Sequence, residues 1–112
     1  YYALNHRERD GRDELRYYEL EHGQHFDAFL PLPGFVDAYV PMQPWMLRGL
    51  DALHARLTAG TPLPPSQVLR SKPRAVAGGK SGAIDDGHLG QLRADPGADA
   101  IMFERGVLRV PE

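Results

Sequence analysis

The sequence predicts an α/β fold, and three patterns along the chain support this prediction. Leu15–Leu20 is an apolar and aromatic run about the length of one strand, and its mixed order is typical of a strand covered on both faces. Pro44–Ala59 carries an apolar stripe at helical spacing. In 100–112, two short apolar runs flank Glu104-Arg105-Gly106, which is typical of a small hairpin.

The predicted strand ends at Gly23, and we expect a sharp turn there because glycine adopts backbone angles that other residues resist. Gln24 and His25 follow this turn. In α/β sheets, ligands and reacting groups gather just beyond the carboxyl ends of strands. Imidazole also suits proton transfer near neutral pH. The sequence therefore indicates His25 as its candidate for chemistry, and a purely structural histidine is the alternative.

An irregular, packed loop is expected after His25, because prolines fix the backbone there and aromatic rings supply apolar surface. Its rings are those of Phe26, Phe29 and Phe35. They could line a pocket or serve ordinary loop packing, and the residues alone leave both interpretations open. A short extended segment is expected next, over Val36–Val40.

The helix is expected over Pro44–Ala59, since proline suits the first turn of a helix and Gly60 suits a C-terminal cap. It is the longest helix that the sequence predicts. We expect its apolar stripe to pack in a core rather than to contact a cofactor. The stripe consists of Met46, Leu50, Leu53 and Leu57.

The chain divides into three predicted regions. Residues 1–60 contain the strand, the loop and the helix, and this single strand lacks neighbours, so we do not expect the chain to fold by itself. Residues 61–99 are rich in glycine and proline, which predicts an extended, coil-rich tail in which Ser66–Arg70 could add a short strand. Residues 100–112 form the hairpin, which must dock on a larger body because a lone hairpin is marginal in water.

Charge and composition exclude several classes of partner. The formal net charge is −2, so no basic field is available to hold nucleic acid. No run approaches the ~18 apolar residues of a membrane span, and no signal-peptide pattern opens the sequence. The absence of cysteine excludes disulfides, thiolate metal sites and a cysteine nucleophile.

Two candidate binding motifs do not meet the geometry that they require. Glu19, Glu21, His22 and His25 could form a carboxylate-histidine metal site, but successive residues of a strand point to opposite faces. Gly78–Ser81 is similar to a phosphate-binding loop, but the position that requires the first glycine of that motif holds an arginine. We therefore expect neither a metal nor a cofactor.

Several short motifs occur in a fixed order over roughly the first two thirds of the chain. They are Gly23–Phe29, Pro33–Phe35, Tyr39–Pro41, Leu63–Val68 followed by Arg70, and Pro73–Arg74, with Tyr2–Asn5 upstream. In this order and spacing they resemble the C-terminal part of the 3-hydroxybutyrate oligomer hydrolases. These are serine esterases, and their fold resembles that of the α/β-hydrolases.

The resemblance implies that the chain is a C-terminal fragment of an α/β-hydrolase-like domain. Residues 1–60 would supply the last sheet strand, the loop of the catalytic histidine and one long helix. His25 matches the histidine of the family's Ser-His-acid triad, and the serine and the acid would lie upstream of Tyr1. Asp27 is too close to His25 in sequence to orient it easily, so we expect Asp27 to make turn or loop hydrogen bonds.

The implied activity is hydrolysis of 3-hydroxybutyrate oligomers, with those oligomers as substrate and the remainder of the catalytic domain upstream as partner. A serine would attack the ester, and His25 would take its proton and hand it to the departing hydroxyl. Alone, the chain would lack the nucleophile and be inactive. The expected substrate-binding residues are Gln24, Phe26, Phe29 and Phe35.

A secreted or periplasmic location is expected for such an enzyme. The alternative function is a non-catalytic scaffold or interaction segment, in which the strand and the helix only complete a larger fold. A serine elbow of the form Gly-x-Ser-x-Gly upstream of the chain distinguishes the two.

Overall fold

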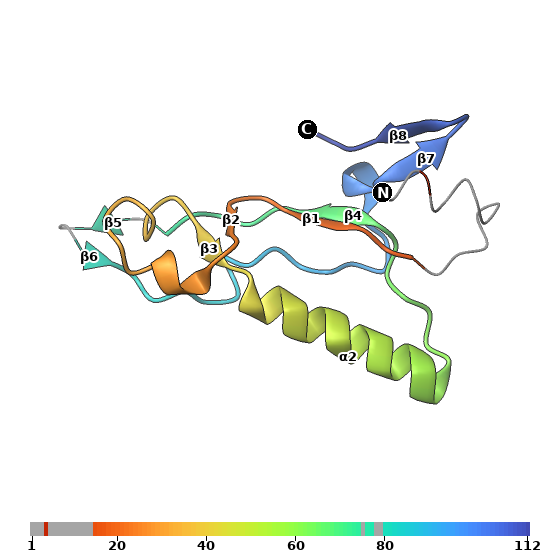
Figure 1. Cartoon of the computed structure of the whole chain (residues 1–112), viewed down its shortest axis with the longest axis horizontal. Coiled ribbons are helices and arrows are strands. Elements are labelled where there is room, and N and C mark those ends of the chain that lie inside the picture. The colour runs from red at the N-terminus through yellow and green to blue at the C-terminus, as the bar shows by residue number, and fades with distance from the viewer. Residues whose placement is uncertain (1–3, 5–14, 75, 78–79) are drawn as a thin grey trace.

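Two parallel strands, β1 (Tyr18–Leu20) and β4 (Gln67–Leu69), form the centre of the structure (Figure 1). The computed structural model describes residue 4 and residues 15–74, 76–77 and 80–112. Parallel neighbours need a long crossover between them. Here the crossover contains α2 (Gln43–Ala59), which lies along one side of the strand pair in Figure 1. The neighbour that the sequence analysis did not find for the first strand is therefore present within the chain.

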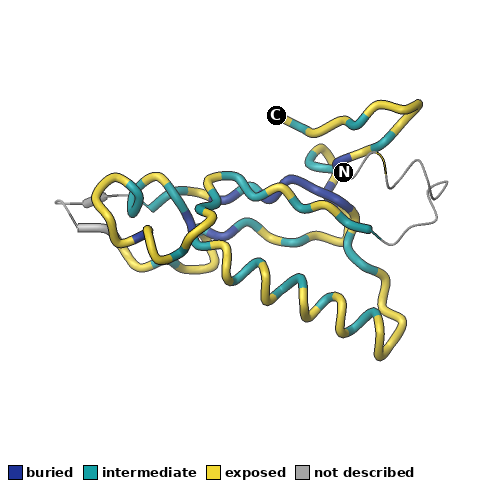
Figure 2. Tube along the Cα trace, viewed as in Figure 1, coloured by how far each residue is buried: buried dark blue, intermediate teal, exposed yellow. Residues whose placement is uncertain are grey.

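All three residues of β4 are deeply buried. Val68 and Leu69 are each 2% exposed, and Gln67 is fully buried. β4 lies within 61–99, where Ser66–Arg70 was expected to add a short strand to an extended tail, and it supplies the buried partner of β1. A short apolar run is hard to recognise as a buried strand in a segment that contains many glycines and prolines. Figure 2 shows the buried residues gathered along β4 and the segments beside it.

The side chain of Gln67 joins β4 to a distant segment. Its amide nitrogen donates to the carbonyl oxygens of Pro65 and Arg93, each at 2.9 Å, and its amide oxygen accepts from the backbone nitrogen of Arg93 at 2.9 Å. The buried amide is thus fully used, as burial of a polar group requires. Nearby, Gly90 approaches the end of β4 so closely that a Cβ there would lie 2.6 Å from the carbonyl oxygen of Arg70.

The turn after β1 differs from its prediction. The residue in the left-handed region is His22, with a φ of 55°, whereas Gly23 belongs to the strand β2 (Gly23–Gln24). A Cβ at Gly23 would lie 2.9 Å from Cδ2 of Leu20, so a larger residue there would require the Leu20 side chain to move. The prediction that Gly23 supplies the turn angle is therefore wrong.

The loop 25–39 leaves β2 and returns as β3 (Val40–Pro41), which pairs in parallel with β2. The loop contains the short 3-10 helix η1 (Asp27–Phe29) and then a series of turns, in which the backbone nitrogen of Tyr39 donates to the carbonyl of Phe35 at 3.1 Å. The extended segment expected over Val36–Val40 is therefore limited to its last residue. The β2–β3 pair closes the base of the loop.

The helix prediction is confirmed, because α2 begins one residue before Pro44 and ends at the expected Ala59. Gly60 caps the helix with a φ of 69°, and its backbone nitrogen bonds to carbonyl oxygens of the last turn. The apolar stripe is not buried, however, and its four side chains are each at least 45% exposed. The expectation of core packing is wrong within the described part of the chain, because no described segment covers this face.

The hairpin predicted in 100–112 is confirmed by β7 (Met102–Glu104) and β8 (Val107–Arg109), which pair antiparallel. The two residues between them, Arg105 and Gly106, have φ angles of 51° and 79°. Positive φ at both central residues is typical of the turns that suit the twist of a hairpin. The backbone nitrogen just before β7 bonds to the carbonyl that precedes β4, so the hairpin docks on the central strand.

A cluster of charged side chains joins the end of β4 to the end of β1, to Asp99 and to the C-terminal residue. Arg70 contacts Asp99 at 2.9 Å, Glu21 at 2.8 Å and the backbone oxygen of Glu112 at 2.7 Å. Arg93 also pairs with Asp99. The hydrogen bond from Arg70 holds the pKa of the Asp99 carboxyl below its usual value.

The remaining elements are short. β5 (Val76–Ala77) and β6 (Lys80–Ser81) pair antiparallel, and the 3-10 helix η2 (Gly97–Asp99) contacts β4. No helix in the described residues is long and apolar enough to cross a membrane. The radius of gyration is 16.1 Å, against about 13 Å for a compact domain of this length, so the arrangement is open.

Candidate active site

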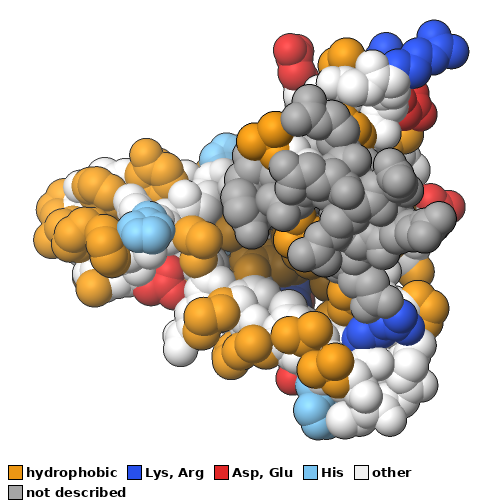
Figure 3. Space-filling model, turned by 45° about the vertical axis from the view of Figure 1, so that its right-hand side comes forward, with side chains coloured by type: hydrophobic (Ala, Val, Ile, Leu, Met, Phe, Trp, Pro, Cys, Tyr) orange, Lys and Arg blue, Asp and Glu red, His pale blue; other side chains and the backbone are white. Residues whose placement is uncertain are grey.

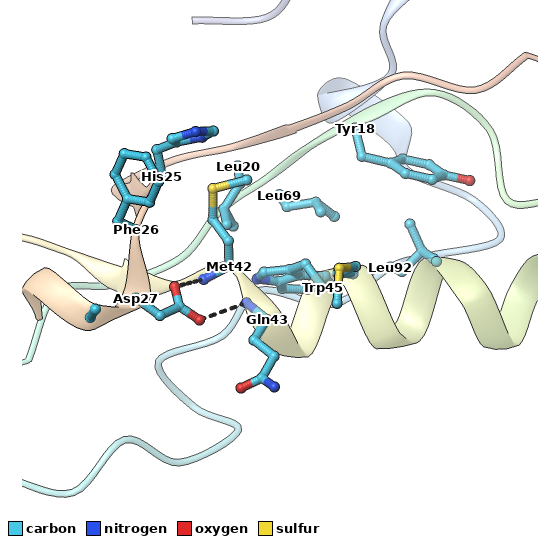
Figure 4. A pocket seen from close by; sticks show the side chains of 13 residues that line it. Tyr18, Leu20, His25, Phe26, Asp27, Met42, Gln43, Trp45, Leu69 and Leu92 are labelled. Atoms are coloured by element: carbon cyan, nitrogen blue, oxygen red, sulfur yellow. Dashed lines mark hydrogen bonds between the residues drawn. The ribbon is translucent and has the colours of Figure 1, made fainter.

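An open pocket of about 660 Å³ lies between the strand pair and the first turns of α2 (Figure 4). Leu20 and Leu69, the last residues of the two parallel strands, both line it. On the helix side it is lined by Met42, Trp45 and Met46. The pocket therefore lies at the carboxyl ends of parallel strands, where ligands of α/β proteins bind.

His25 lies at the edge of this pocket, with an exposed side chain. The left-handed turn at His22 and the strand β2 bring it there. Its ring packs edge-on against the ring of Phe26, with centroids 4.4 Å apart and planes at 74°. No side chain in the described part of the chain hydrogen-bonds to the His25 ring. Both ring nitrogens are therefore available to groups outside the described residues.

Asp27 joins the histidine loop to the start of α2. Its two carboxylate oxygens accept hydrogen bonds from the backbone nitrogens of Met42 at 2.8 Å and Gln43 at 3.0 Å (dashed lines in Figure 4). The first amide groups of a helix have no partner within it, and a negative charge is stabilised there by the helix dipole. The expected loop hydrogen bonds of Asp27 are confirmed, and its carboxylate is committed to the helix rather than to His25.

The aromatic residues of the loop form a chain of ring contacts. The ring of Phe29 lies 5.4 Å from that of Phe26 and 6.3 Å from that of Phe35, and Phe35 lies 5.5 Å from Tyr39. Of these rings, only Phe26 lines the pocket. Phe29 packs against Phe26, and Phe35 packs against Phe29, so these two rings serve loop packing, and the two interpretations of the aromatic loop apply to different residues.

Gln24, which was expected to bind substrate, does not line the pocket either. Its amide oxygen accepts a hydrogen bond from the backbone nitrogen of Phe26 at 3.4 Å. The structure thus brings His25 and Phe26 to the pocket and places Gln24, Phe29 and Phe35 outside its lining.

Tyr18 and Trp45 are pocket residues that the sequence analysis did not single out. The hydroxyl of Tyr18 donates to the carbonyl of Pro64 at 2.8 Å, and burial raises the pKa of this phenol, so it stays protonated. Trp45 lies under the guanidinium of Arg48, 4.6 Å from the ring centroid. Its position in the first turn of a helix, after Pro44, was the one signal that could have indicated it.

The four residues weighed as a metal site do not form a cluster of potential ligands. Glu21 pairs with Arg70, and within the described residues no group of three or more histidine, aspartate and glutamate side chains could hold a metal ion. The phosphate-loop motif falls partly on Gly78 and Gly79, which lie outside the described residues.

One histidine-carboxylate pair is present that the sequence analysis missed. Nδ1 of His88 lies 2.8 Å from Oδ1 of Asp85, and this hydrogen bond holds the pKa of the Asp85 carboxyl below its usual value. The same carboxylate accepts from the backbone nitrogen of Gly87 at 2.9 Å. The pair therefore closes a local turn, and neither residue lines the pocket.

The model of the 3HB-oligomer hydrolase family (3HBOH) matches residues 1–112, which is the whole chain. The chain belongs to this family. The resemblance that the short motifs indicated is thereby confirmed, and it extends beyond Arg74, where those motifs end.

Relatives in the 3HB-oligomer hydrolase family show how much of a longer protein the chain represents. A D-(-)-3-hydroxybutyrate oligomer hydrolase of Burkholderia lata is 43% identical over 99% of this chain, and one of Burkholderia vietnamiensis is 40% identical over the same share. One of Azoarcus sp. (strain BH72) is 41% identical over the whole chain. The chain covers 16% of each Burkholderia protein and 17% of the Azoarcus protein, in their C-terminal part. No solved structure matches.

Proposed function

We propose that this chain contributes the catalytic histidine, His25, to a serine esterase that hydrolyses 3-hydroxybutyrate oligomers. Membership of the 3HB-oligomer hydrolase family supports the substrate, and the names of the relatives state the same activity for those proteins. The nucleophilic serine and the acid of the triad lie in the N-terminal remainder of the longer enzyme. The chain alone is therefore inactive.

The observation that carries this proposal is the position and the unused ring of His25. The ring lies at a pocket beyond the ends of two parallel strands and makes no hydrogen bond to the described residues. A triad histidine needs one ring nitrogen for the serine and the other for a carboxylate. His25 offers both, whereas the pocket-remote His88 already has a carboxylate within its own turn.

The chemistry is acyl transfer in two steps. The serine oxygen attacks the ester carbonyl while His25 takes the serine proton, and His25 then returns that proton to the departing hydroxyl of the released unit. Water, deprotonated by His25, attacks the acyl-enzyme in the second step, and the serine leaves with the proton. An imidazole can both accept and donate a proton near neutral pH, which suits this double role.

The pocket supports a small ester with apolar parts. Its volume of about 660 Å³ falls in the range of roughly 300–1,000 Å³ for small-molecule sites. Phe26, Met46 and Leu69 supply apolar walls for the methyl and methylene groups of hydroxybutyrate units. A non-catalytic scaffold role is the alternative, and the exposed apolar stripe of α2 favours it, because such a face serves assembly rather than catalysis.

Variants of a full-length hydrolase that carries this chain test the proposal. His25→Ala should lower turnover of a 3-hydroxybutyrate dimer by about five to six orders of magnitude, as removal of a triad base does elsewhere. His22→Gly suits the left-handed φ of 55° and should cost roughly tenfold or less. His88→Ala removes the histidine that pairs with Asp85 away from the pocket, and this control should also have a mild effect.

Circular dichroism must show that each variant is folded before turnover is compared. If His88→Ala is inactive and His25→Ala is active, the Asp85–His88 pair rather than His25 supplies the catalytic base. An upstream sequence without a Gly-x-Ser-x-Gly elbow would favour the scaffold instead.

A further inference from the structure

The outer face of α2 carries a continuous apolar stripe with no cover in the described structure. Met46 is 59% exposed, Leu50 54%, Leu53 45% and Leu57 77%. Their spacing along the helix places them in one row about 16 Å long. Figure 3 shows apolar side chains in a row along the helix. We call these four residues the α2 stripe.

The exposure of the α2 stripe does not come from a detached helix. Arg48, on another side of the helix, donates to the carbonyl of Gly90 at 3.2 Å and pairs with Asp86 at 3.0 Å. Its guanidinium also lies over Trp45. Together with the Asp27 cap at the start of α2, these contacts fix the rotation of the helix, so the stripe faces outward in a defined orientation.

The charges around the α2 stripe argue against a lipid surface as its cover. Helices that lie on membranes carry lysines and arginines on the polar face, where they meet anionic headgroups. The only basic residues of α2 are Arg48 and Arg56. Arg48 pairs with Asp86, and Arg56 donates to the carbonyl of Gly60 at 3.1 Å. An apolar protein surface therefore fits the stripe better than a membrane does.

The length of the relatives indicates which protein surface this is. The chain covers 16% of the Burkholderia lata hydrolase, in its C-terminal part, so most of such an enzyme lies N-terminal to Tyr1. Met46 belongs both to the α2 stripe and to the pocket of His25. A body that covers the stripe thus also reaches the pocket, as the carrier of the nucleophile must.

We infer that the α2 stripe is the docking face for the N-terminal part of the hydrolase. The identity of the docking partner rests on the proposed function. The inference itself concerns packing and not the role of His25. The N-terminal part packs an apolar surface along Met46–Leu57. The stripe is then core in the complete enzyme, although it is exposed in the described structure.

Thiol labelling of a full-length hydrolase that carries this chain tests the inference directly. This chain has no cysteine, so Leu50→Cys and Leu53→Cys each introduce a new thiol on the stripe. Thr58→Cys is the matched control, because Thr58 is exposed and lies off the stripe on the same helix. Labelling by a maleimide reagent at the two stripe positions should be at least tenfold slower than at position 58, and denaturant should remove the difference, since buried thiols react only through opening. Labelling of cysteines already present in the parent enzyme is measured separately and subtracted.

Equal labelling at all three positions in the folded enzyme would overturn the inference. Protection from labelling that is lost on dilution, as a dimer dissociates, would assign the stripe to contact with a second copy of the enzyme. Protection that requires anionic phospholipid vesicles would assign it to a membrane. Both results also overturn it.

As a second measurement, Leu57→Glu should lower the melting temperature by several degrees, while Thr58→Glu should leave it unchanged. Neither readout uses turnover, so a protected stripe beside a fully active His25→Ala enzyme would reject the catalytic role alone.

Discussion

At the scale of single residues, Gln67 is the side chain on which the packing of β4 depends most. It is fully buried, and it satisfies the backbone nitrogen and the carbonyl of Arg93. Gln67→Leu keeps most of the volume but leaves these groups unpaired. We expect the free energy of unfolding to fall by about 1–3 kcal/mol for each group. Urea unfolding of the full-length hydrolase measures this loss.

The exposed Gln91 provides the control for this substitution. Gln91→Leu makes the same chemical change at a side chain without a hydrogen bond in the described structure, so the urea midpoint of this variant should differ little from that of the parent. A Gln67→Leu enzyme as stable as the parent would mean that water or rearranged backbone replaces the glutamine.

The sequence indicated some residues of the site and not others, and the difference has a physical cause. His25 was indicated because it lies two residues after the glycine that ends a predicted strand, which is local information. The left-handed turn at His22 was missed, because a positive φ is uncommon outside glycine and the sequence offered Gly23 next to it as the turn residue. Trp45 was missed, because its place in the pocket depends on segments distant in sequence.

At the scale of elements, the cap between the histidine loop and α2 makes Asp27 a positioning residue. Asp27→Ala removes both hydrogen bonds to the helix start, which should cost about 1 kcal/mol of stability. It also releases the loop that carries His25. Because a displacement of about 1 Å can cost about a hundredfold in rate, we expect kcat of the full-length hydrolase to fall by roughly 10- to 100-fold.

Asp27→Asn separates positioning from a general loss of stability. Its amide oxygen can accept one of the two hydrogen bonds, so its kcat should lie between those of the parent and Asp27→Ala. Asp51→Ala, at an exposed position of α2, should leave kcat unchanged. An Asp27→Ala enzyme with normal kcat would show that the cap does not hold His25 in place.

The predictability of the elements follows from how local their signals are. The helix was predicted to within one residue, because its stripe, its proline and its capping glycine all lie within the element. The outward orientation of its stripe could not be predicted, since periodicity marks an apolar face without naming what covers it. β4 was predicted only as a short strand added to a tail, because three buried residues stand among many glycines and prolines.

At the scale of the whole molecule, the ion cluster around Arg70 makes stability depend on pH. The pKa of Asp99 is lowered in the folded state, mainly by its hydrogen bond with Arg70. Such a group stabilises the fold fully above its unfolded pKa of about 3.9, and the stabilisation is lost as the pH falls through the lower folded value. The full-length hydrolase should therefore lose the contribution of Asp99 only below about pH 4.

The difference in urea midpoint between the parent and Asp99→Asn isolates this contribution. It should be constant from about pH 7 to about pH 5 and shrink below about pH 4. Asp51→Asn, which removes an exposed carboxylate, should show no such change. A difference in urea midpoint between the parent and Asp99→Asn that stays constant down to about pH 2, or widens there, would contradict the role of the Asp99–Arg70 ion pair.

The pocket belongs to the whole molecule, and the sequence indicated one near the aromatic loop without showing which residues line it. Its lining comes from β1, the histidine loop, α2, β4 and Leu92, which only the fold brings together. Local patterns found the histidine, and the family resemblance supplied its expected role. Leu20 and Leu69 meet in its lining only because β1 and β4 pair in parallel register.

The central claim is that the imidazole of His25 carries the proton in ester hydrolysis, and chemical rescue tests it most directly. In a full-length hydrolase, His25→Gly leaves a space at the edge of an open pocket, which added imidazole can enter. Imidazole should restore a saturable part of the lost turnover, and more of it as the pH rises and imidazole becomes neutral. It should have no effect on His22→Gly, which should be nearly as active as the parent. A folded His25→Gly enzyme that stays inactive at every imidazole concentration, or that keeps parental turnover without it, would contradict the claim.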